Sequence, residues 1–268
     1  MSNSSLKAVS MKSTVFNPAF IRSVRRSLFG VLVGLAAVAT PAAFANEGGG
    51  LQAANTSLSN PGSLQNGAKL YFNYCSGCHA LSFMRYARIA DDLGLSEEQV
   101  TKNFMFTDAK FGETIHANIN PTEATEWFGK APPDLSLEVR ARGADWVYTY
   151  LKSFYLDPSR PIGWNNTLFP NASMPNPLWE RQGLQTATFK PGLNGADPTL
   201  EKFELRHPGS ETPAQFDETV RDLTAFLQYA SEPIALHRKS IGIWVLLYLG
   251  VFTLLAWLLK KEYWKDVH

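Results

Sequence analysis

Two cysteines and a histidine stand together in the motif C-S-G-C-H, formed by Cys75, Cys78 and His79. The chain has no other cysteine among its 268 residues. Thiols three positions apart can each add to one of the two vinyl groups of a haem, and the imidazole of the next residue can then reach the iron. The C-x-x-C-H pattern is typical of c-type haem attachment. The motif therefore predicts one covalent haem c, with Cys75 and Cys78 in thioether bonds and His79 as an axial ligand.

The cysteine pair has three other interpretations. A thioredoxin-like C-x-x-C does not need the histidine, and no βαβ pattern surrounds this one. A structural zinc site needs four ligands, whereas the sequence holds no second cysteine pair. A plain disulfide would suit an oxidising compartment. The histidine directly after the second cysteine favours haem over all three.

The sixth iron ligand decides between catalysis and electron transfer, because an open site admits small molecules and a second strong ligand does not. Three methionines follow the motif: Met84, Met105 and Met174. Met84 is too close to the motif to reach the opposite face of a haem, and Met105 lies in an apolar F-M-F run. Met174 lies in N-A-S-M-P-N-P, a stiff loop that can present a thioether across the haem. We predict Met174 as the ligand, with His116 and His207 as its rivals.

A proline-rich stretch followed by arginines, A-P-P-D-L-S and then V-R-A-R, supplies candidates for the wall of a haem pocket. Pro132 and Pro133 have no backbone N–H and stiffen the chain, which suits a wall beside the histidine. Arg140 and Arg142 can pair with haem propionates, since a guanidinium group matches a carboxylate. Of the two arginines, we favour Arg142.

Apolar spacing predicts four helices that would position these residues. They cover residues 66–74, 96–104, 145–155 and 212–230. Ser96 with Gln99, and Thr212 with Gln215, fit capping boxes at two of the N-termini. Many Pro, Gly and Asn residues between 157 and 197 predict long loops. The expected fold class is mostly α.

The N-terminus has the features of a secretory signal peptide, predicted to occupy residues 1–45. It is basic, its apolar run covers residues 28–39, and the sequence Ala43-Phe44-Ala45 fits the small-x-small cleavage pattern. The apolar run is shorter than the ~20 residues that a membrane span needs. We therefore expect export and cleavage after Ala45.

A second apolar run, residues 241–259, contains no charged side chain and is close to the ~20 residues that cross a bilayer. Residues 238–259 are predicted to form a transmembrane anchor helix with its flank. Aromatic and lysine residues follow it, as is common at a membrane interface. With a cleaved signal, residues 46–237 form an exported haem domain and residues 260–268 a short cytoplasmic tail.

The exported segment is acidic. Residues 46–237 contain 15 Lys and Arg against 22 Asp and Glu, a formal charge of −7. This charge argues against nucleic-acid binding and favours a basic partner, because a charged face steers encounter with its opposite. Acidic residues gather at 91–92, at 97–98, and at 123 and 126.

The ordered set of motifs resembles the cytochrome c1 family, the haem subunits of quinol–cytochrome c oxidoreductase (cytochrome bc1) complexes. From residue 66 onward the chain has C-S-G-C-H with M-R-Y-A-R, then P-P-D-L-S-x-x-x-R-A-R, M-P-x-P-L, and F-L-Q-Y-A-S-E-P followed by H-R-K-S and the anchor. Two departures stand out. The sequence E-W-F-G-K-A, with Trp127 and Phe128, replaces an A-N-x-G-A stretch common in the family, and the extra cysteines of some members are absent.

The resemblance implies a cytochrome c-like haem domain with long loops plus one C-terminal transmembrane helix. It implies His79 and Met174 as axial ligands and Arg142 near a propionate. It also implies a one-electron relay in a respiratory chain, from a Rieske iron–sulfur protein to a c-type cytochrome, beside a cytochrome b subunit. The expected place is a bacterial inner membrane, with the haem domain in the periplasm and the C-terminus in the cytoplasm. Quinol chemistry would then belong to the cytochrome b subunit.

Two other functions remain open. The chain could be the membrane-anchored cytochrome c of a terminal oxidase, which would bring copper-bearing subunits instead of a Rieske centre. It could also be a haem peroxidase, which would need a vacant or labile sixth site. The sequence has no second C-x-x-C-H, which argues against two-haem peroxidases.

Overall fold

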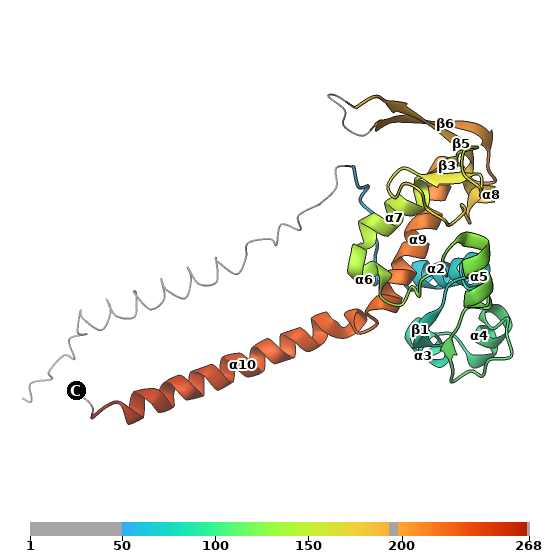
Figure 1. Cartoon of the computed structure of the whole chain (residues 1–268). Coiled ribbons are helices and arrows are strands. Elements are labelled where there is room, and N and C mark those ends of the chain that lie inside the picture. The colour runs from blue at the N-terminus through green and yellow to red at the C-terminus, as the bar shows by residue number, and fades with distance from the viewer. Residues whose placement is uncertain (1–49, 193–197, 267–268) are drawn as a thin grey trace, which may run out of the picture. The chain divides into compact units, whose positions relative to one another are not determined.

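The structure, a computed structural model, describes residues 50–192 and 198–266. The predicted signal peptide, residues 1–45, lies outside the described residues. In chain order the helices and strands are α2 (Pro61–Tyr74), β1 (Leu81–Arg85), α3 (Tyr86–Leu93), α4 (Glu97–Phe104), β2 (Thr114–Ile115), α5 (Pro121–Phe128), α6 (Glu138–Arg142), α7 (Ala144–Lys152), β3 (Phe154–Leu156), β4 (Trp164–Asn166), α8 (Trp179–Gln182), β5 (Gly183–Lys190), β6 (Thr199–Pro208), α9 (Pro213–Ser231) and α10 (Ala235–Tyr263). The strands form three separate antiparallel pairs, β1–β2, β3–β4 and β5–β6. The expected fold, mostly helical with one apolar C-terminal helix, is confirmed (Figure 1).

Helices α2 and α9 cross in close contact at the centre of the domain (Figure 1). Gly67 makes this approach possible, because a Cβ atom there would lie 2.1 Å from the backbone oxygen of Asp222. The carboxylate of Asp222 accepts hydrogen bonds from the Ser63 hydroxyl at 2.5 Å and from the Asn66 amide at 2.8 Å. The contact therefore joins close backbone packing to a partly buried polar network.

An aromatic cluster fills the core beside this crossing. Phe72 stacks on Phe104 and on Tyr86, with ring centroids 4.7 and 5.8 Å apart. The ring of Tyr71 meets Phe72 edge-on at 5.1 Å and also contacts Phe226 of α9. Burial of such large apolar side chains is the main stabilising contribution to a domain of this size. The cluster fixes the C-terminal end of α2, from which the haem motif emerges.

Helices α6 and α7 pack against α9. They supply part of the wall of the cavity that the Cys75–His79 motif also lines. The short strands β3 and β4 follow α7 and lead into the loop that holds Met174. Gln185 of β5 is buried and donates hydrogen bonds to the backbone oxygens of Lys152 and Phe154. Gln185 therefore ties the start of β5 to the end of α7 and to β3, next to the loop.

The predicted helices agree with the structure within a few residues at most boundaries. Both capping boxes are confirmed, at Ser96 with Gln99 and at Thr212 with Gln215. Helix α2 begins five residues before the predicted start, at Pro61, where Asn60 accepts a hydrogen bond as its N-cap. The predicted helix 145–155 is shorter, since α7 ends at Lys152 and β3 follows.

The prediction of long loops from 157 to 197 is wrong for three short elements in that range, β4, α8 and β5. Residues 183–190 form β5, which pairs with β6 through a register with two irregularities. Much of the hairpin is exposed, so its strands lack the clear alternation of a half-buried sheet. The stability of β5 depends on its pairing with β6, and the sequence of β5 alone does not reveal that partner.

The C-terminal helix α10 has the length and composition of a membrane span. Within its segment Ser240–Tyr263, a stretch of 18 residues reaches a mean hydropathy of 2.2, and its large apolar side chains are exposed. In a helix of a globular domain these side chains would be packed in a core, whereas on α10 they are suited to contact with the lipid of a membrane. Glu232 forms ion pairs with Arg238 at 2.6 Å and with Arg140 at 3.8 Å at the start of this helix.

Candidate haem site

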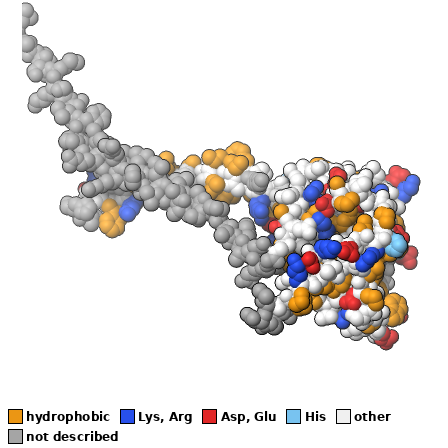
Figure 2. Space-filling model, turned by 90° about the horizontal axis from the view of Figure 1, so that it is seen from above, with side chains coloured by type: hydrophobic (Ala, Val, Ile, Leu, Met, Phe, Trp, Pro, Cys, Tyr) orange, Lys and Arg blue, Asp and Glu red, His pale blue; other side chains and the backbone are white. Residues whose placement is uncertain are grey.

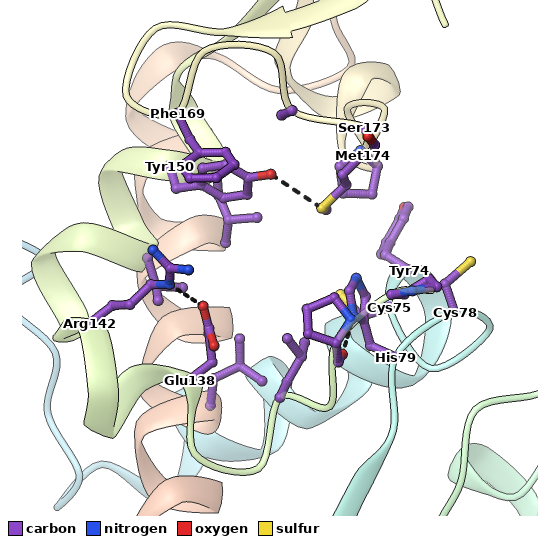
Figure 3. A pocket seen from close by; sticks show the side chains of 18 of the residues that line it. Tyr74, Cys75, Cys78, His79, Glu138, Arg142, Tyr150, Phe169, Ser173 and Met174 are labelled. Atoms are coloured by element: carbon purple, nitrogen blue, oxygen red, sulfur yellow. Dashed lines mark hydrogen bonds and ion pairs between the residues drawn. The ribbon is translucent and has the colours of Figure 1, made fainter. Parts of the chain in front are cut away.

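The haem motif forms a tight turn directly after α2. Cys75 caps the helix, and the N–H groups of Cys78 and His79 both donate to the backbone oxygen of Cys75, at 3.0 and 2.8 Å. Both cysteines are free; Cys75 is buried and Cys78 is exposed. The turn places Cys75, Cys78 and His79 in the lining of one cavity (Figure 3).

The orientation of His79 is fixed by a backbone acceptor. Its Nδ1 lies 2.7 Å from the carbonyl oxygen of Pro133. A carbonyl can only accept, so Nδ1 carries the proton and Nε2 keeps a free lone pair. This is the arrangement that metal-binding histidines adopt. Burial lowers the pKa of His79 although the Pro133 carbonyl raises it, so the imidazole is neutral and ready to bind iron.

The loop that supplies this acceptor is itself clamped to the segment after the motif. Asp134 accepts hydrogen bonds from the backbone N–H of Ser82 at 2.9 Å and of Ser136 at 2.7 Å. Desolvation raises the pKa of Asp134, but the hydrogen bonds from Ser136 and Ser82 outweigh it and hold the pKa below its usual value. Leu135 donates to the backbone oxygen of Ala80 at 2.9 Å. Pro133 thus acts through its carbonyl oxygen, which the sequence argument, based on proline stiffness, did not foresee.

Met174 enters the cavity from the other side, on a loop ordered by asparagines (Figure 3). The side-chain oxygen of Asn166 accepts from the N–H groups of Leu168 and Phe169, at 2.9 and 3.0 Å. Asn165 accepts from Asn171 at 2.8 Å. Both asparagines are buried. The sequence argument relied on the prolines of this loop, whereas the structure shows asparagine side chains that hydrogen-bond to its backbone.

The cavity between the two walls contains about 1320 Å³ of space free of protein atoms, including the part that opens to solvent. Mostly apolar side chains line it, together with the motif residues and Met174: Tyr74, Phe128, Pro132, Pro133, Leu135, Val139, Trp146, Val147, Leu151, Phe169, Pro177, Leu223 and Leu227. A large planar apolar ring system suits this space.

Charged groups lie at one side of the cavity. Arg142 lines it and forms an ion pair with Glu138 through its Nε. The guanidinium carbon of Arg142 also lies 4.4 Å from the ring centroid of Trp146. Arg140 instead pairs with Glu232 on the opposite side of α6 from this cavity's lining. The structure thus separates the two arginines and places Arg142 at the site, with Glu138 as a neighbour that the sequence analysis missed.

The rival iron ligands lie elsewhere. Met84 is buried in the apolar core, and Met105 packs against that core. His116 is exposed and contacts the Thr114 hydroxyl at 3.0 Å, while His207 is exposed on β6. Among the methionines of the described ranges, Met174 lines the cavity.

Tyr150 is a second residue of the site that the sequence analysis missed. It lines the cavity from α7, and its hydroxyl lies 3.7 Å from the sulfur of Met174. Burial raises the pKa of Tyr150 to about 12. The nearby charge of Arg142 lowers this pKa, and that of Glu138 raises it, both by less than the burial does. In the sequence it was only one apolar position of the predicted helix 145–155, because tyrosines at helical spacing are common in cores.

The residues present fit a haem c. A neutral imidazole with a free Nε2 and a thioether sulfur enter an apolar cavity from opposite walls, and two thiols lie beside the imidazole. In residues 50–192 and 198–266, no cluster of three or more His, Cys, Asp or Glu side chains could hold a metal ion by itself. The imidazole nitrogen, the thioether sulfur and the two thiols therefore suit an iron atom that is already held in a haem. They do not suit a metal ion without a cofactor.

Fold and site together define a membrane-anchored c-type cytochrome. The model of the Cytochrome C1 family matches residues 55–267. A cytochrome c1 of Allochromatium vinosum is 51% identical over 231 residues, which cover 85% of this chain and 95% of the relative. The chain belongs to the cytochrome c1 family.

Two further relatives are similar over most of their length. A protein of Nitrosomonas europaea named ammonia monooxygenase gamma subunit is 43% identical over 206 residues, covering 77% of this chain and 84% of the relative. A cytochrome c1 of Rhodospirillum rubrum is 30% identical over 239 residues, covering 76% and 81%. With the family established, the chain is a membrane-anchored haem subunit of a quinol–cytochrome c oxidoreductase, it carries one covalent haem c, and it associates with a cytochrome b subunit.

Proposed function

We propose that this chain relays single electrons from a Rieske iron–sulfur protein to a c-type cytochrome. The observation that carries the proposal is the cavity itself, with His79 on one wall and Met174 on the other. When bound, the haem supplies a one-electron carrier. With His79 and Met174 both holding the iron, a small molecule would find no free place on it, which would favour electron transfer over catalysis.

Each residue of the site has a distinct part in this proposal. Cys75 and Cys78 would hold the haem through thioether bonds, and His79 would bind the iron through Nε2. The carbonyl oxygen of Pro133 orients the imidazole by accepting a hydrogen bond from its Nδ1–H, with 2.7 Å between nitrogen and oxygen. Met174 supplies the second axial ligand from its loop.

Arg142 is proposed to pair with a haem propionate. In the structure its guanidinium group is paired with Glu138 and lies over Trp146, at the polar side of the cavity. Its five N–H donors allow it to serve Glu138 and a second carboxylate at the same time. Such sharing would keep the propionate charge compensated inside a largely apolar site.

The proposed topology places the haem domain in the periplasm of a bacterial cell. Residues 1–45 are removed as a signal peptide, residues 46–237 form the periplasmic domain, residues 238–259 carry the anchor, and residues 260–268 stay in the cytoplasm. This orientation rests mainly on the predicted signal peptide. Lys260 and Lys261 at the end of α10 fit a cytoplasmic C-terminus, but Arg238 and Lys239 on the other flank weaken the argument from positive charge. The short connection between α9 and α10 holds the haem domain close to the bilayer.

The proposed acceptor is a basic c-type cytochrome that encounters the acidic domain by electrostatic steering. Glu97 and Glu98 lie in the first turn of α4 and are exposed, as are Glu123 and Glu126 of α5. Figure 2 shows charges of both signs interspersed with apolar side chains on the visible face. The proposed steering therefore depends on the net charge of the whole domain, and we do not assign it to one acidic face.

A pull-down combined with rapid kinetics tests the proposal. A tagged chain is purified in mild detergent from its native membrane, and the haem is reduced by quinol in a single turnover. We expect cytochrome b and a Rieske protein to co-purify, and haem reduction to stop when the Rieske protein is removed. Co-purification of copper-bearing oxidase subunits, or haem reduction that persists without the Rieske protein, would contradict the relay.

A further inference from the structure

Tyr150 approaches the sulfur of Met174 from within the haem cavity. Its hydroxyl oxygen lies 3.7 Å from Sδ, within hydrogen-bond reach of a sulfur acceptor (Figure 3). A thioether sulfur has two lone pairs. One can bind iron while the other accepts a hydrogen bond, so the contact is compatible with axial ligation.

The ring of Tyr150 is held firmly in this position. It stacks on Trp146 with centroids 5.0 Å apart and planes at 10°, and it meets Phe154 edge-on at 5.0 Å. The guanidinium group of Arg142 lies over Trp146 in turn. A phenol fixed by two aromatic neighbours loses little further freedom when it donates a hydrogen bond.

One buried side chain also ties Tyr150 to the methionine loop. The amide nitrogen of Asn166 donates to the backbone oxygen of Tyr150 at 2.8 Å, and its amide oxygen accepts the N–H groups of Leu168 and Phe169. Asn166 is 1% exposed. The distance between the Tyr150 hydroxyl and the Met174 loop is therefore set by the scaffold as well as by the hydrogen bond.

We propose that Tyr150 is a positioning residue that orients the Met174 thioether and tunes its strength as an iron ligand through a hydrogen bond from the phenol to Sδ. The proposal rests on the proposed role of Met174 as axial ligand. Partners that hydrogen-bond to metal ligands orient them and adjust their donor strength. No part of the cysteine attachment or of the histidine wall is involved.

The direction of the effect follows from charge. A hydrogen bond donated to the sulfur withdraws electron density from it and makes it a weaker donor to iron. A weaker donor favours the ferrous form, which carries less positive charge, over the ferric form. Loss of the phenol hydroxyl should therefore shift the equilibrium towards the oxidised form and lower the midpoint potential.

The test compares Tyr150→Phe with Tyr148→Phe in the haem-loaded complex. Tyr148 lies on the same helix, and its hydroxyl faces Lys152 Nζ at 3.3 Å instead of Met174. We expect Tyr150→Phe to shift the redox equilibrium two- to fivefold towards the oxidised form, which is about 20–40 mV at 59 mV per tenfold for one electron. The ferric sulfur-to-iron charge-transfer band should also move. Tyr148→Phe should leave both the potential and the band unchanged.

Three outcomes are distinguishable. An unchanged midpoint and band in Tyr150→Phe, or an equal shift in Tyr148→Phe, would overturn the role of Tyr150 while the band itself still supported Met174 as ligand. Absence of that band in the unmodified protein, with no change in Met174→Leu, would overturn the ligand assignment and this inference with it. A fall in thermal stability alone, without a change of midpoint or band, would reduce Tyr150 to a packing residue and so refute the proposal.

Discussion

The replacement Gly67→Ala tests how closely α2 and α9 must approach. The added Cβ would meet the backbone oxygen of Asp222 at 2.1 Å and the Cβ of Phe226 at 2.7 Å. Neither atom belongs to the end of a flexible side chain, so the helices themselves must move apart. The movement would also stretch the hydrogen bonds from Ser63 and Asn66 to Asp222.

Opposing effects set how much the free energy of unfolding falls in Gly67→Ala. Alanine in place of glycine favours a helix by roughly 0.5–1 kcal/mol. Overpacking of a close contact typically costs about 1–3 kcal/mol, and each weakened hydrogen bond costs up to ~1 kcal/mol more. A net loss of about 2 kcal/mol is expected from these terms. At about 2–4 °C per kcal/mol for a domain of this size, the melting midpoint should fall by roughly 4–8 °C.

Gly62→Ala provides a matched control on the same helix. A Cβ at Gly62 would meet only the side-chain oxygen of Asn60, at an ordinary 3.4 Å. The control should keep or slightly raise the melting midpoint, since it gains helix propensity without a clash. The assay is thermal unfolding of the haem-loaded, detergent-solubilised protein, followed by the haem absorption and by circular dichroism. If Gly67→Ala melts at the same temperature as Gly62→Ala, the close-approach argument is wrong.

Three further predictions concern the haem, the clamp and the charged surface. Cys75→Ala combined with Cys78→Ala should abolish haem stain on a denaturing gel, and full-strength stain would refute covalent attachment through this pair. Asp134→Ala removes the acceptor of two backbone N–H groups and should cost about 1 kcal/mol, measured as a lower melting midpoint; an unchanged midpoint would show that the clamp contributes nothing. Glu97→Gln with Glu98→Gln should lower the association rate with a basic cytochrome more than it changes the haem midpoint, and the rate should fall steeply with salt because the Debye length shrinks from about 10 Å at 0.1 M to about 3 Å at 1 M. Stopped-flow rates that do not depend on ionic strength would contradict the steering.

The motifs with strong local chemistry could be predicted from the sequence. The C-x-x-C-H spacing identifies the attachment turn because the chemistry of two vinyl groups and one iron demands it. Capping boxes at Ser96 and Thr212 located two helix starts, since N-cap hydrogen bonds involve only near neighbours in the chain. The apolar run of α10 was equally plain, because crossing a bilayer requires length and hydrophobicity alone.

The contacts that complete the site could not be predicted in this way. The pairing of Tyr150 with Met174, and the support of the loop by Asn166, arise where α7 and the segments after it fold against one another. The role of Pro133 is carried by a backbone oxygen, which every residue possesses and no side-chain pattern reveals. Strand β5 was missed for a related reason, because its pairing with β6 is a tertiary contact and its side chains lack a regular alternation of buried and exposed positions.

Axial ligation by His79 and Met174 is the central claim, and the ferric spectrum of the intact haem-loaded complex tests it most directly. Near-infrared magnetic circular dichroism and electron paramagnetic resonance distinguish histidine–methionine from bis-histidine ligation. The account predicts a histidine–methionine signature in the unmodified protein, lost in Met174→Leu together with a fall in the midpoint potential. A bis-histidine signature, or a Met174→Leu protein with an unchanged spectrum and midpoint, would contradict it.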